Sequence, residues 1–185
     1  MNFEKHFDLE GKHAFLSPSN PQWLRYDIEK LRSVFINRLN VQRGTELHEF
    51  AASAIKLRQK LPRSTKTLNN YVNDCIGYRM QPEQKLYYSA YCFGTADCIQ
   101  FKNDLLRIFD LKTGITPAHQ EQLEIYAALF CLEYSMDPKL IDLDLRLYQN
   151  DDVNQWSPTA DYLIDIMEDI KQKDKELTKI RMELE

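Results

Sequence analysis

The segment CFGTADCIQFKNDLLRIFDLKTG, residues 92–114, decides the fold. Two runs rich in Ile, Leu and Phe flank the polar triplet KND, which predicts two strands joined by a turn near Asn103-Asp104. The second run ends unusually, because Asp110 and Lys112 follow its apolar residues. Side chains two positions apart on a strand share a face and lie about 6–7 Å from each other. Charged groups in such a place need a partner or a function.

The predicted turn brings Asp97 of the first strand to the level of Asp110 on the second. Two neighbouring carboxylates repel each other and shift their pKa values unless a cation lies between them. Mg²⁺ suits such a pair, because it takes one or two carboxylates and otherwise binds water and phosphate oxygens. The Lys112 ammonium could then steady an attacking water or a scissile phosphate. An ordinary ion pair between Asp110 and Lys112 is the alternative.

The pattern of an acid and a lysine separated by one residue carries no weight without its context. It occurs five times, and in four of these places the surroundings are polar or helical, which is typical of a solvated surface pair. Only Asp110 emerges from a strongly apolar strand, LLRIF. The other occurrences begin at Glu10, Glu83, Asp137 and Asp169.

Helical patterns flank the predicted hairpin on both sides. Apolar spacing predicts helices over residues 21–40, 45–61 and, more weakly, 67–80, with a break at the NVQRG segment, and a further helix over 115–136. Residues 141–150 alternate like a strand, and Ser157-Pro158 opens a long C-terminal helix, 157–185. We expect one domain over residues 1–185, with an N-terminal helical part, 1–80. The fold class is α/β (α+β), with a small central mixed sheet flanked by helices.

Two helical segments carry further candidate residues. His48 lies on the helix 45–61, where a neutral imidazole could bind a metal, although a surface or core histidine is the commoner case. Gln122 and Tyr126 are spaced i, i+4 and therefore share one helix face. A plain polar face is the alternative for this second pair.

The order of the motifs carries more information than any one of them. GTELHE (44–49), GTAD (94–97), FDLKTG (109–114) and QLEIY (122–126) follow one another on a helix, two strands and a helix. In order, spacing and local structure this series resembles the PD-(D/E)XK nuclease superfamily, in its RecB-like branch. The segment FLSPSNPQWLRYD (15–27) is similar to the lead-in of RecE-like and related phage exonucleases.

The resemblance implies a restriction-endonuclease-like core and assigns a role to each matching residue. It implies that Lys112 is the catalytic lysine, while Gln122 and Tyr126 support the site and contact DNA. Iron–sulfur clusters of related branches need cysteines after the nuclease core, and no cysteine follows Cys131, so we predict no cluster. The implied ligands of Mg²⁺, or of Mn²⁺ in its place, are His48, Asp97, Asp110 and the Leu111 carbonyl.

Composition fits a soluble chain without a strong charge preference. The 185 residues carry a net charge of −4, which argues mildly against nonspecific nucleic-acid binding but leaves local patches free to act. The longest apolar run is far shorter than the ~20 residues that a membrane helix needs, and the N-terminus lacks a signal-peptide pattern. We therefore expect a cytoplasmic protein without membrane contact, in the host cytoplasm if a phage encodes it.

One basic stretch, KLRQKLPRSTK at 56–66, contains no acidic residue. Its side chains could contact DNA phosphates, or simply complement the dipole at a helix end. The five basic residues are Lys56, Arg58, Lys60, Arg63 and Lys66.

Together these features predict a Mg²⁺-dependent deoxyribonuclease that hydrolyses phosphodiester bonds. An exonuclease of phage or mobile-element recombination or repair is favoured slightly over an endonuclease, and RNA cleavage stays open. Strand polarity, strand preference, a recombination partner protein and homo-oligomerisation are likewise open at the level of sequence. The alternative is a nuclease-like module that binds DNA or a partner without cutting.

Overall fold

A computed structural model describes residues 4–184, and the described chain divides into two compact units that meet between Arg43 and Gly44. After an all-helical start, a group of strands, a helical segment, a second group of strands and a final helix follow. In chain order the elements are η1 (Phe7–Leu9), η2 (Pro21–Arg25), α1 (Ile28–Lys56), α2 (Thr67–Tyr78), β1 (Gln81–Ser89), β2 (Cys92–Lys102), β3 (Leu105–Leu111), α3 (Glu121–Glu133), η3 (Pro138–Leu140), β4 (Asp142–Gln149), β5 (Asp152–Trp156) and α4 (Ala160–Leu184).

The first unit is held together by a few contacts between its irregular start and the α1 helix. The rings of Phe15 and Phe35 meet edge to face with centroids 5.0 Å apart, and the Arg38 guanidinium donates to the His13 carbonyl at 3.1 Å. Over residues 4–43 no side chain is buried, so this unit has no closed core of its own. Its stability therefore comes from local helix formation and a few half-exposed aromatic contacts.

The α1 helix runs through the segment at which the sequence predicted a break. Residues 41–44 continue the helix, so the predicted separation of helices 21–40 and 45–61 is wrong. Glycine costs a helix about 1 kcal/mol but does not forbid it, and no proline interrupts this stretch. Gly44 has a packing reason to lack a side chain, because a Cβ there would lie 2.8 Å from the Thr113 Oγ1.

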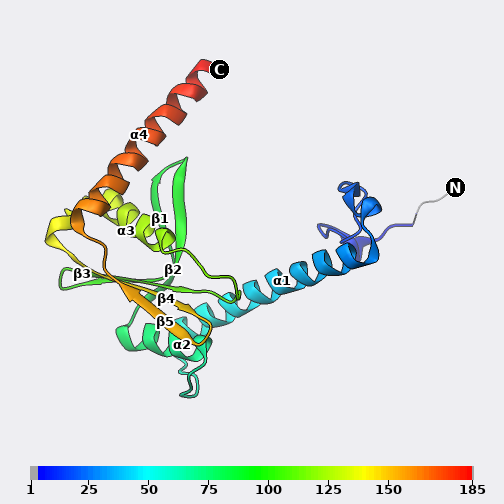
Figure 1. The fold of residues 1–185 in the computed structure, drawn as a ribbon, viewed down its shortest axis with the longest axis horizontal. Coiled ribbons are helices and arrows are strands. Elements are labelled where there is room, and N and C mark those ends of the chain that lie inside the picture. The colour runs from blue at the N-terminus through cyan, green and yellow to red at the C-terminus, as the bar shows by residue number, and fades with distance from the viewer. Residues whose placement is uncertain (1–3, 185) are drawn as a thin grey trace. The chain divides into compact units, whose positions relative to one another are not determined.

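The second unit is built on a sheet in which β1 to β5 lie in sequence order (Figure 1). Neighbours pair antiparallel except β3 and β4, which are parallel and are connected through α3. Among the described residues this makes one five-stranded mixed sheet with helices on both faces. The predicted α/β class with a small mixed sheet flanked by helices is confirmed.

Alternate residues of the central strands supply two hydrophobic layers. Ile108 faces α3 and the start of α4, whereas Phe109 faces α2 and the C-terminal part of α1. The same alternation separates Leu147 from Tyr148 on β4. Since both faces of β3 and β4 are covered, a polar side chain placed here must find a partner inside the protein.

Two Asn-Asp turns shape the sheet. Asn103-Asp104 joins β2 to β3 as predicted, and both residues have positive φ, 52° and 57°. Asn150-Asp151 joins β4 to β5 with φ of 54° and 61°. Such turns match the twist of a two-residue hairpin, and Asn and Asp tolerate this backbone better than most residues. The strand β5 was not predicted, because DVNQW is too polar to look like a strand, although the repeated Asn-Asp pair indicated a second turn.

Three predicted helix starts lie too early, and the first is that of the helix predicted over 21–40, which becomes α-helical only at Ile28, after the 3₁₀ helix η2. The segment predicted as helix 115–136 becomes helical only at Glu121, because Gln149 pins the preceding loop by donating to the carbonyls of Gly114, at 2.6 Å, and Thr116, at 2.7 Å. The C-terminal helix begins at Ala160 rather than 157, after Thr159, whose hydroxyl accepts from the Tyr162 amide at 3.3 Å. No helix within residues 4–184 is long and apolar enough to cross a membrane.

Phe109→Ala should lower the free energy of unfolding by about 3–5 kcal/mol, because Phe109 is fully buried and its ring contacts Tyr78 and Tyr148. Urea denaturation followed by circular dichroism measures the change. Phe93, which is 66% exposed on β2, is the matched control, and Phe93→Ala should cost less than about 1 kcal/mol. Equal losses would contradict this assignment of the core.

Candidate active site

The two carboxylates that the sequence singled out lie side by side at the end of the β2–β3 ladder. The register pairs Cys98 with Phe109, so the next positions, Asp97 and Asp110, face each other across the strands. The Asp97 Oδ2 accepts a hydrogen bond from the Leu111 amide at 3.0 Å. This bond fixes the Asp97 carboxylate beside the end of β3, as the predicted hairpin turn required.

Lys112 contacts the Asp110 carboxylate and one helix side chain. Its Nζ lies 3.2 Å from Asp110 Oδ1 and 3.0 Å from Asp110 Oδ2, and it donates to the Gln122 Oε1 at 2.7 Å. The contact with Oδ2 is the shorter of the two but is poorly aligned, so only Oδ1 receives a true hydrogen bond. The Lys112 amide donates to the Tyr148 carbonyl at 2.9 Å, which anchors the residue to β4.

Asp110 is the most constrained charge of the site. It is 2% exposed, and within the described chain its Oδ2 is a buried atom without a hydrogen-bond partner. Burial raises the pKa of Asp110 to about 6, and the neighbouring Asp97 charge adds to the rise, while Lys112 opposes it. A carboxylate kept in such a place, with one oxygen unsatisfied, marks a functional site more often than a structural one.

His48 joins the site from α1. Its Nδ1 lies 3.3 Å from the Asp97 Oδ2, and about a third of the His48 side chain is exposed. The hydrogen bond to Asp97 raises the pKa of His48, and partial burial opposes this rise. The structure therefore places His48 next to Asp97, and its role as a metal ligand stays a prediction.

Gln122 and Tyr126 both point from α3 toward the sheet, as their spacing predicted. Gln122 reaches Lys112, whereas the Tyr126 hydroxyl donates to the Thr95 carbonyl at 2.7 Å. This second bond ties α3 to β2 two residues before Asp97. A Cβ at Gly94 would lie 2.8 Å from the Tyr126 ring, so the glycine makes room for it. The two helix residues thus act on different parts of the site.

The donor set suits a divalent cation, although the side chains do not enclose one. Among the described residues, no group of three or more His, Cys, Asp or Glu side chains is arranged as a metal site. In their place, the Lys112 Nζ contacts Asp110 and the His48 Nδ1 contacts Asp97. The Asp110 Oδ2, which accepts no hydrogen bond, and the neighbouring Asp97 carboxylate are hard oxygen donors of the kind that Mg²⁺ takes. The residues therefore fit such an ion.

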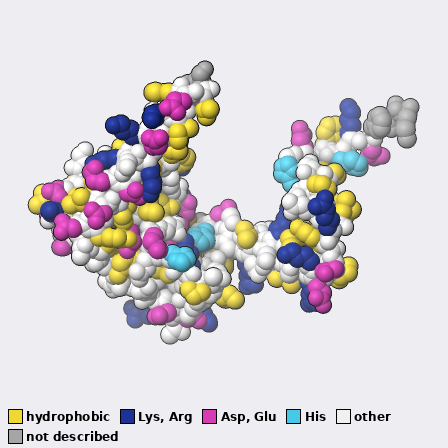
Figure 2. Space-filling view, turned by 45° about the horizontal axis from the view of Figure 1, so that its top comes forward, with side chains coloured by type: hydrophobic (Ala, Val, Ile, Leu, Met, Phe, Trp, Pro, Cys, Tyr) yellow, Lys and Arg dark blue, Asp and Glu magenta, His cyan; other side chains and the backbone are white. Residues whose placement is uncertain are grey.

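The predicted basic stretch lies at the end of α1 and in the loop to α2, and its side chains are exposed. Lys66 differs from the others, because its Nζ pairs with the Asp151 carboxylate at 2.8 Å. On the face of the second unit seen in Figure 2, lysines and arginines alternate with acidic residues and form no continuous basic surface. Phosphate contact by Lys56, Arg58, Lys60 and Arg63 stays a prediction.

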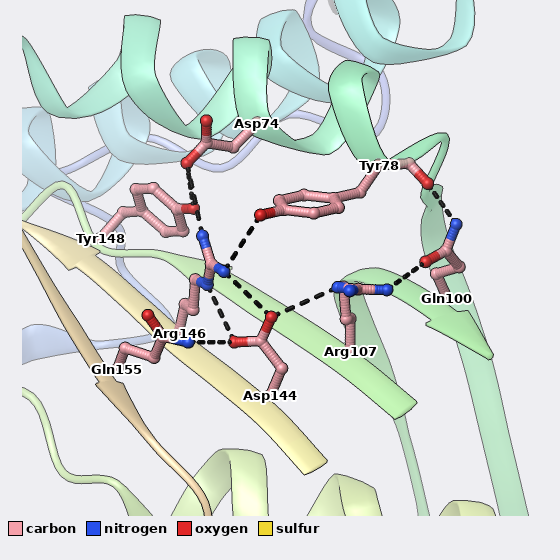
Figure 3. A network of polar contacts seen from close by, with 8 residues as sticks. All are labelled: Asp74, Tyr78, Gln100, Arg107, Asp144, Arg146, Tyr148 and Gln155. Carbon is pink, nitrogen blue, oxygen red and sulfur yellow. Dashed lines mark hydrogen bonds and ion pairs between the residues drawn. The ribbon is translucent and has the colours of Figure 1, made fainter. Parts of the chain in front are cut away.

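A second polar network lies on the opposite face of the sheet, under α2 (Figure 3). Arg146 bonds both oxygens of Asp144, at 2.9 and 3.0 Å, and its guanidinium packs 5.1 Å from the centre of the Tyr78 ring. The Tyr148 hydroxyl donates to Asp74 at 2.7 Å, and Arg107 reaches the Asp144 carboxylate at 3.3 Å. Such bidentate, desolvated pairs hold a fixed geometry.

This network bears on the site through Tyr148. The side chain of Tyr148 is held by Asp74, and its carbonyl accepts the Lys112 amide. Tyr148 was not predicted as a supporting residue. The available signal was the pair Asp144 and Arg146 on an otherwise apolar strand, the same signal that singled out Asp110.

A family model described as "Protein of unknown function (DUF2800)" matches residues 63–183, and the chain therefore belongs to this family. The matched part contains Asp97, Asp110, Lys112, Gln122 and Tyr126 but begins after His48. No solved structure matches the chain.

Asp110→Asn should stabilise the protein at high pH when a chelator removes divalent cations. A carboxyl whose folded pKa is raised from 3.8 to about 6 contributes stability below pH 3.8, and this contribution is lost as the pH rises through 6. The variant's gain in unfolding free energy should therefore be larger at pH 8 than at pH 4, by about 2–3 kcal/mol. Urea titrations at both pH values measure it, with the exposed Asp104→Asn as control. A pH-independent difference would contradict the burial argument.

Gly94→Ala should destabilise the fold by about 1–3 kcal/mol, because the added methyl group meets the Tyr126 ring, which the Thr95 bond holds in place. Gly114→Ala is the matched control, since no atom outside its neighbours lies within 4 Å of the new Cβ. Thermal denaturation of both variants makes the comparison. A Gly94 variant as stable as the Gly114 variant would show that Tyr126 is free to move.

Proposed function

Because family membership assigns no activity to this chain, we propose that it is a divalent-cation-dependent nuclease that hydrolyses DNA phosphodiester bonds. The observation that supports this proposal is the buried Asp110 carboxylate, which faces Asp97 across two strands and pairs with a lysine that Gln122 also holds. The proposal includes a restriction-endonuclease-like core of the PD-(D/E)XK type. It also includes an exonuclease role in phage or mobile-element recombination or repair.

Asp97 and Asp110 would hold the Mg²⁺ ion, with His48 and the Leu111 carbonyl as further ligands. When bound between such carboxylates, the ion lowers the pKa of a coordinated water and offsets negative charge on the scissile phosphate. Mn²⁺ takes the same oxygen and imidazole donors and should substitute. The Leu111 amide already orients Asp97, so this carboxylate does not have to be repositioned by the substrate.

Lys112 would supply the fixed positive charge of the reaction. The Lys112 side chain is about three-quarters buried, and two side chains, Asp110 and Gln122, hold its ammonium in one orientation. A preorganised cation in a partly desolvated site stabilises the charge that develops on the attacked phosphate more strongly than it would in water. The contact with Gln122 keeps the lysine in place when the Asp110 oxygens turn to a cation.

A purely structural ion pair is a weaker account of the same residues. Replacing a buried ion pair by apolar side chains is often neutral or stabilising, so stability by itself gives little reason to bury Asp110. Asp110 has a raised pKa, a second acid at its side and an unsatisfied oxygen, and each of these costs stability. Costs of this kind gathered at one point are typical of catalytic sites.

Purified protein with Mg²⁺ or Mn²⁺ should degrade linear double-stranded DNA and leave covalently closed circles intact. Gel analysis of linear, circular and single-stranded DNA, with an RNA of the same sequence, makes the comparison. Cutting of closed circular DNA would contradict the exonuclease assignment. Cutting of RNA alone would show that RNA, and not DNA, is the substrate. Release of 5′-phosphorylated products is expected from the PD-(D/E)XK-type reaction, in which water attacks the phosphorus in line with the 3′-oxygen and the bond to that oxygen breaks.

Asp110→Ala and Lys112→Ala should each reduce cleavage by about 10²- to 10⁴-fold, since each removes one charge of the site. The chain carries a matched control on α4, where Asp169 and Lys171 have the same spacing on an exposed helix surface. Asp169→Ala and Lys171→Ala should cut at the wild-type rate. Full activity of the Asp110 variant would refute the site.

Cation binding distinguishes the proposed nuclease from the alternative, a module that binds DNA or a partner without cutting. We expect the wild-type chain to bind Mn²⁺ in electron paramagnetic resonance titrations and the Asp110→Ala variant to bind it at least about tenfold more weakly. A wild-type chain that neither binds Mn²⁺ nor cuts any nucleic acid would favour the non-cutting module.

A further inference from the structure

A hollow of about 320 Å³ lies next to Lys112, between the C-terminal end of β3 and the start of α2. Its apolar walls come from three leucines of three different elements, and polar residues complete the lining. Lys112 and Thr113 follow β3, and Asn150 and Asp151 belong to the β4–β5 turn. The leucines are Leu47, Leu68 and Leu111.

We propose that this hollow binds one nucleoside, the base and sugar of the nucleotide that adjoins the scissile phosphate. The inference deepens the proposed function and rests on it for the identity of the ligand. The volume is at the small end of the range for ligand pockets, ~300–1,000 Å³, and so suits one nucleotide better than a longer segment.

The distribution of charge orients the nucleotide in the hollow. The phosphate belongs beside Lys112, because Lys112 also contacts Asp110. The other cation of the lining, Lys66, is already paired with Asp151. The same carboxylate accepts from the Thr67 amide at 2.9 Å and so caps the N-terminus of α2. An anion beside Lys66 would also meet the Asp151 charge, so the phosphate is disfavoured there.

The leucines and Asn150 fit the two kinds of surface that a nucleobase offers. A base has apolar faces, which pack on leucine side chains, and a polar edge, which needs hydrogen-bond partners. Asn150 lines the hollow from the β4–β5 turn, and its side chain is exposed. An amide offers both a donor and an acceptor, so Asn150 can bond the edge of any of the four bases. The hollow therefore selects for a base without reading its identity.

The test measures binding of mononucleotides to the full chain by titration followed with NMR. The probes are the nucleotides dAMP and dTMP. The controls, 2-deoxyribose 5-phosphate and inorganic phosphate, also carry a phosphate but have no base. We expect both nucleotides to bind at least about tenfold more tightly than either base-free probe, with shifts at Leu68 and Asn150. Equal binding of all four probes, or binding of none, would overturn the inference.

Two variants locate the binding. Leu68→Trp fills the hollow and should weaken dAMP binding by at least about tenfold, whereas Leu57→Trp, at a side chain that is 72% exposed and outside the lining, should leave it unchanged. Asn150→Gly keeps the left-handed turn at φ 54° and removes only the amide, so about threefold to tenfold weaker binding is expected. Wild-type binding by the Asn150 variant and by a folded Leu68 variant would overturn the inference.

The outcome is separable from the proposed activity, because mononucleotide binding needs neither cleavage nor added metal. A chain that cuts DNA but binds dAMP no better than 2-deoxyribose 5-phosphate would keep its nuclease assignment and lose the nucleoside pocket. A chain that binds dAMP in the hollow but cuts no nucleic acid would support the pocket and lose the nuclease assignment.

Discussion

The pairing of β3 with β4 places a carboxylate, Asp110, at a position where both faces of the sheet are covered. That burial is the constraint on which the site depends, since a charge without water must be matched by neighbouring groups. Lys112 supplies the opposite charge, and it stays in place because Gln122 holds its ammonium and Tyr148 holds its amide. Removing any of these contacts leaves a buried charge less well compensated, so the site behaves as one unit.

Because side chains alternate along β3 and β4, the two faces of the sheet carry different sets of residues. One face combines the apolar layer under α3 with the Asp110–Lys112 pair, and the other carries the Arg146–Asp144 network under α2. The second network is partly buried and largely satisfied, which makes it rigid. Because Tyr148 belongs to that network and also accepts the Lys112 amide, the rigid face supports the face that we propose to be catalytic.

Prediction from sequence succeeded where a contact depends on neighbours along the chain. The hairpin, its Asn103-Asp104 turn and the level of the two aspartates all follow from strands joined by two residues. The break assigned to α1 was wrong because a single glycine weakens a helix without ending it. The strand β5 was missed because edge strands carry polar residues, which hide the alternation that marks a buried strand.

The sequence by itself determined the two carboxylates, their register and the lysine two residues beyond, because the side-chain period of a strand and a short turn leave no other arrangement. Only the tertiary structure decided which residues from distant segments contact the aspartates and the lysine. His48 reaches Asp97 from α1, Gln122 reaches Lys112 from α3, and Tyr148 accepts the Lys112 amide across a parallel strand pair. These contacts join segments far apart in the chain, and they form only after helices pack on both faces of the sheet, which no local pattern specifies.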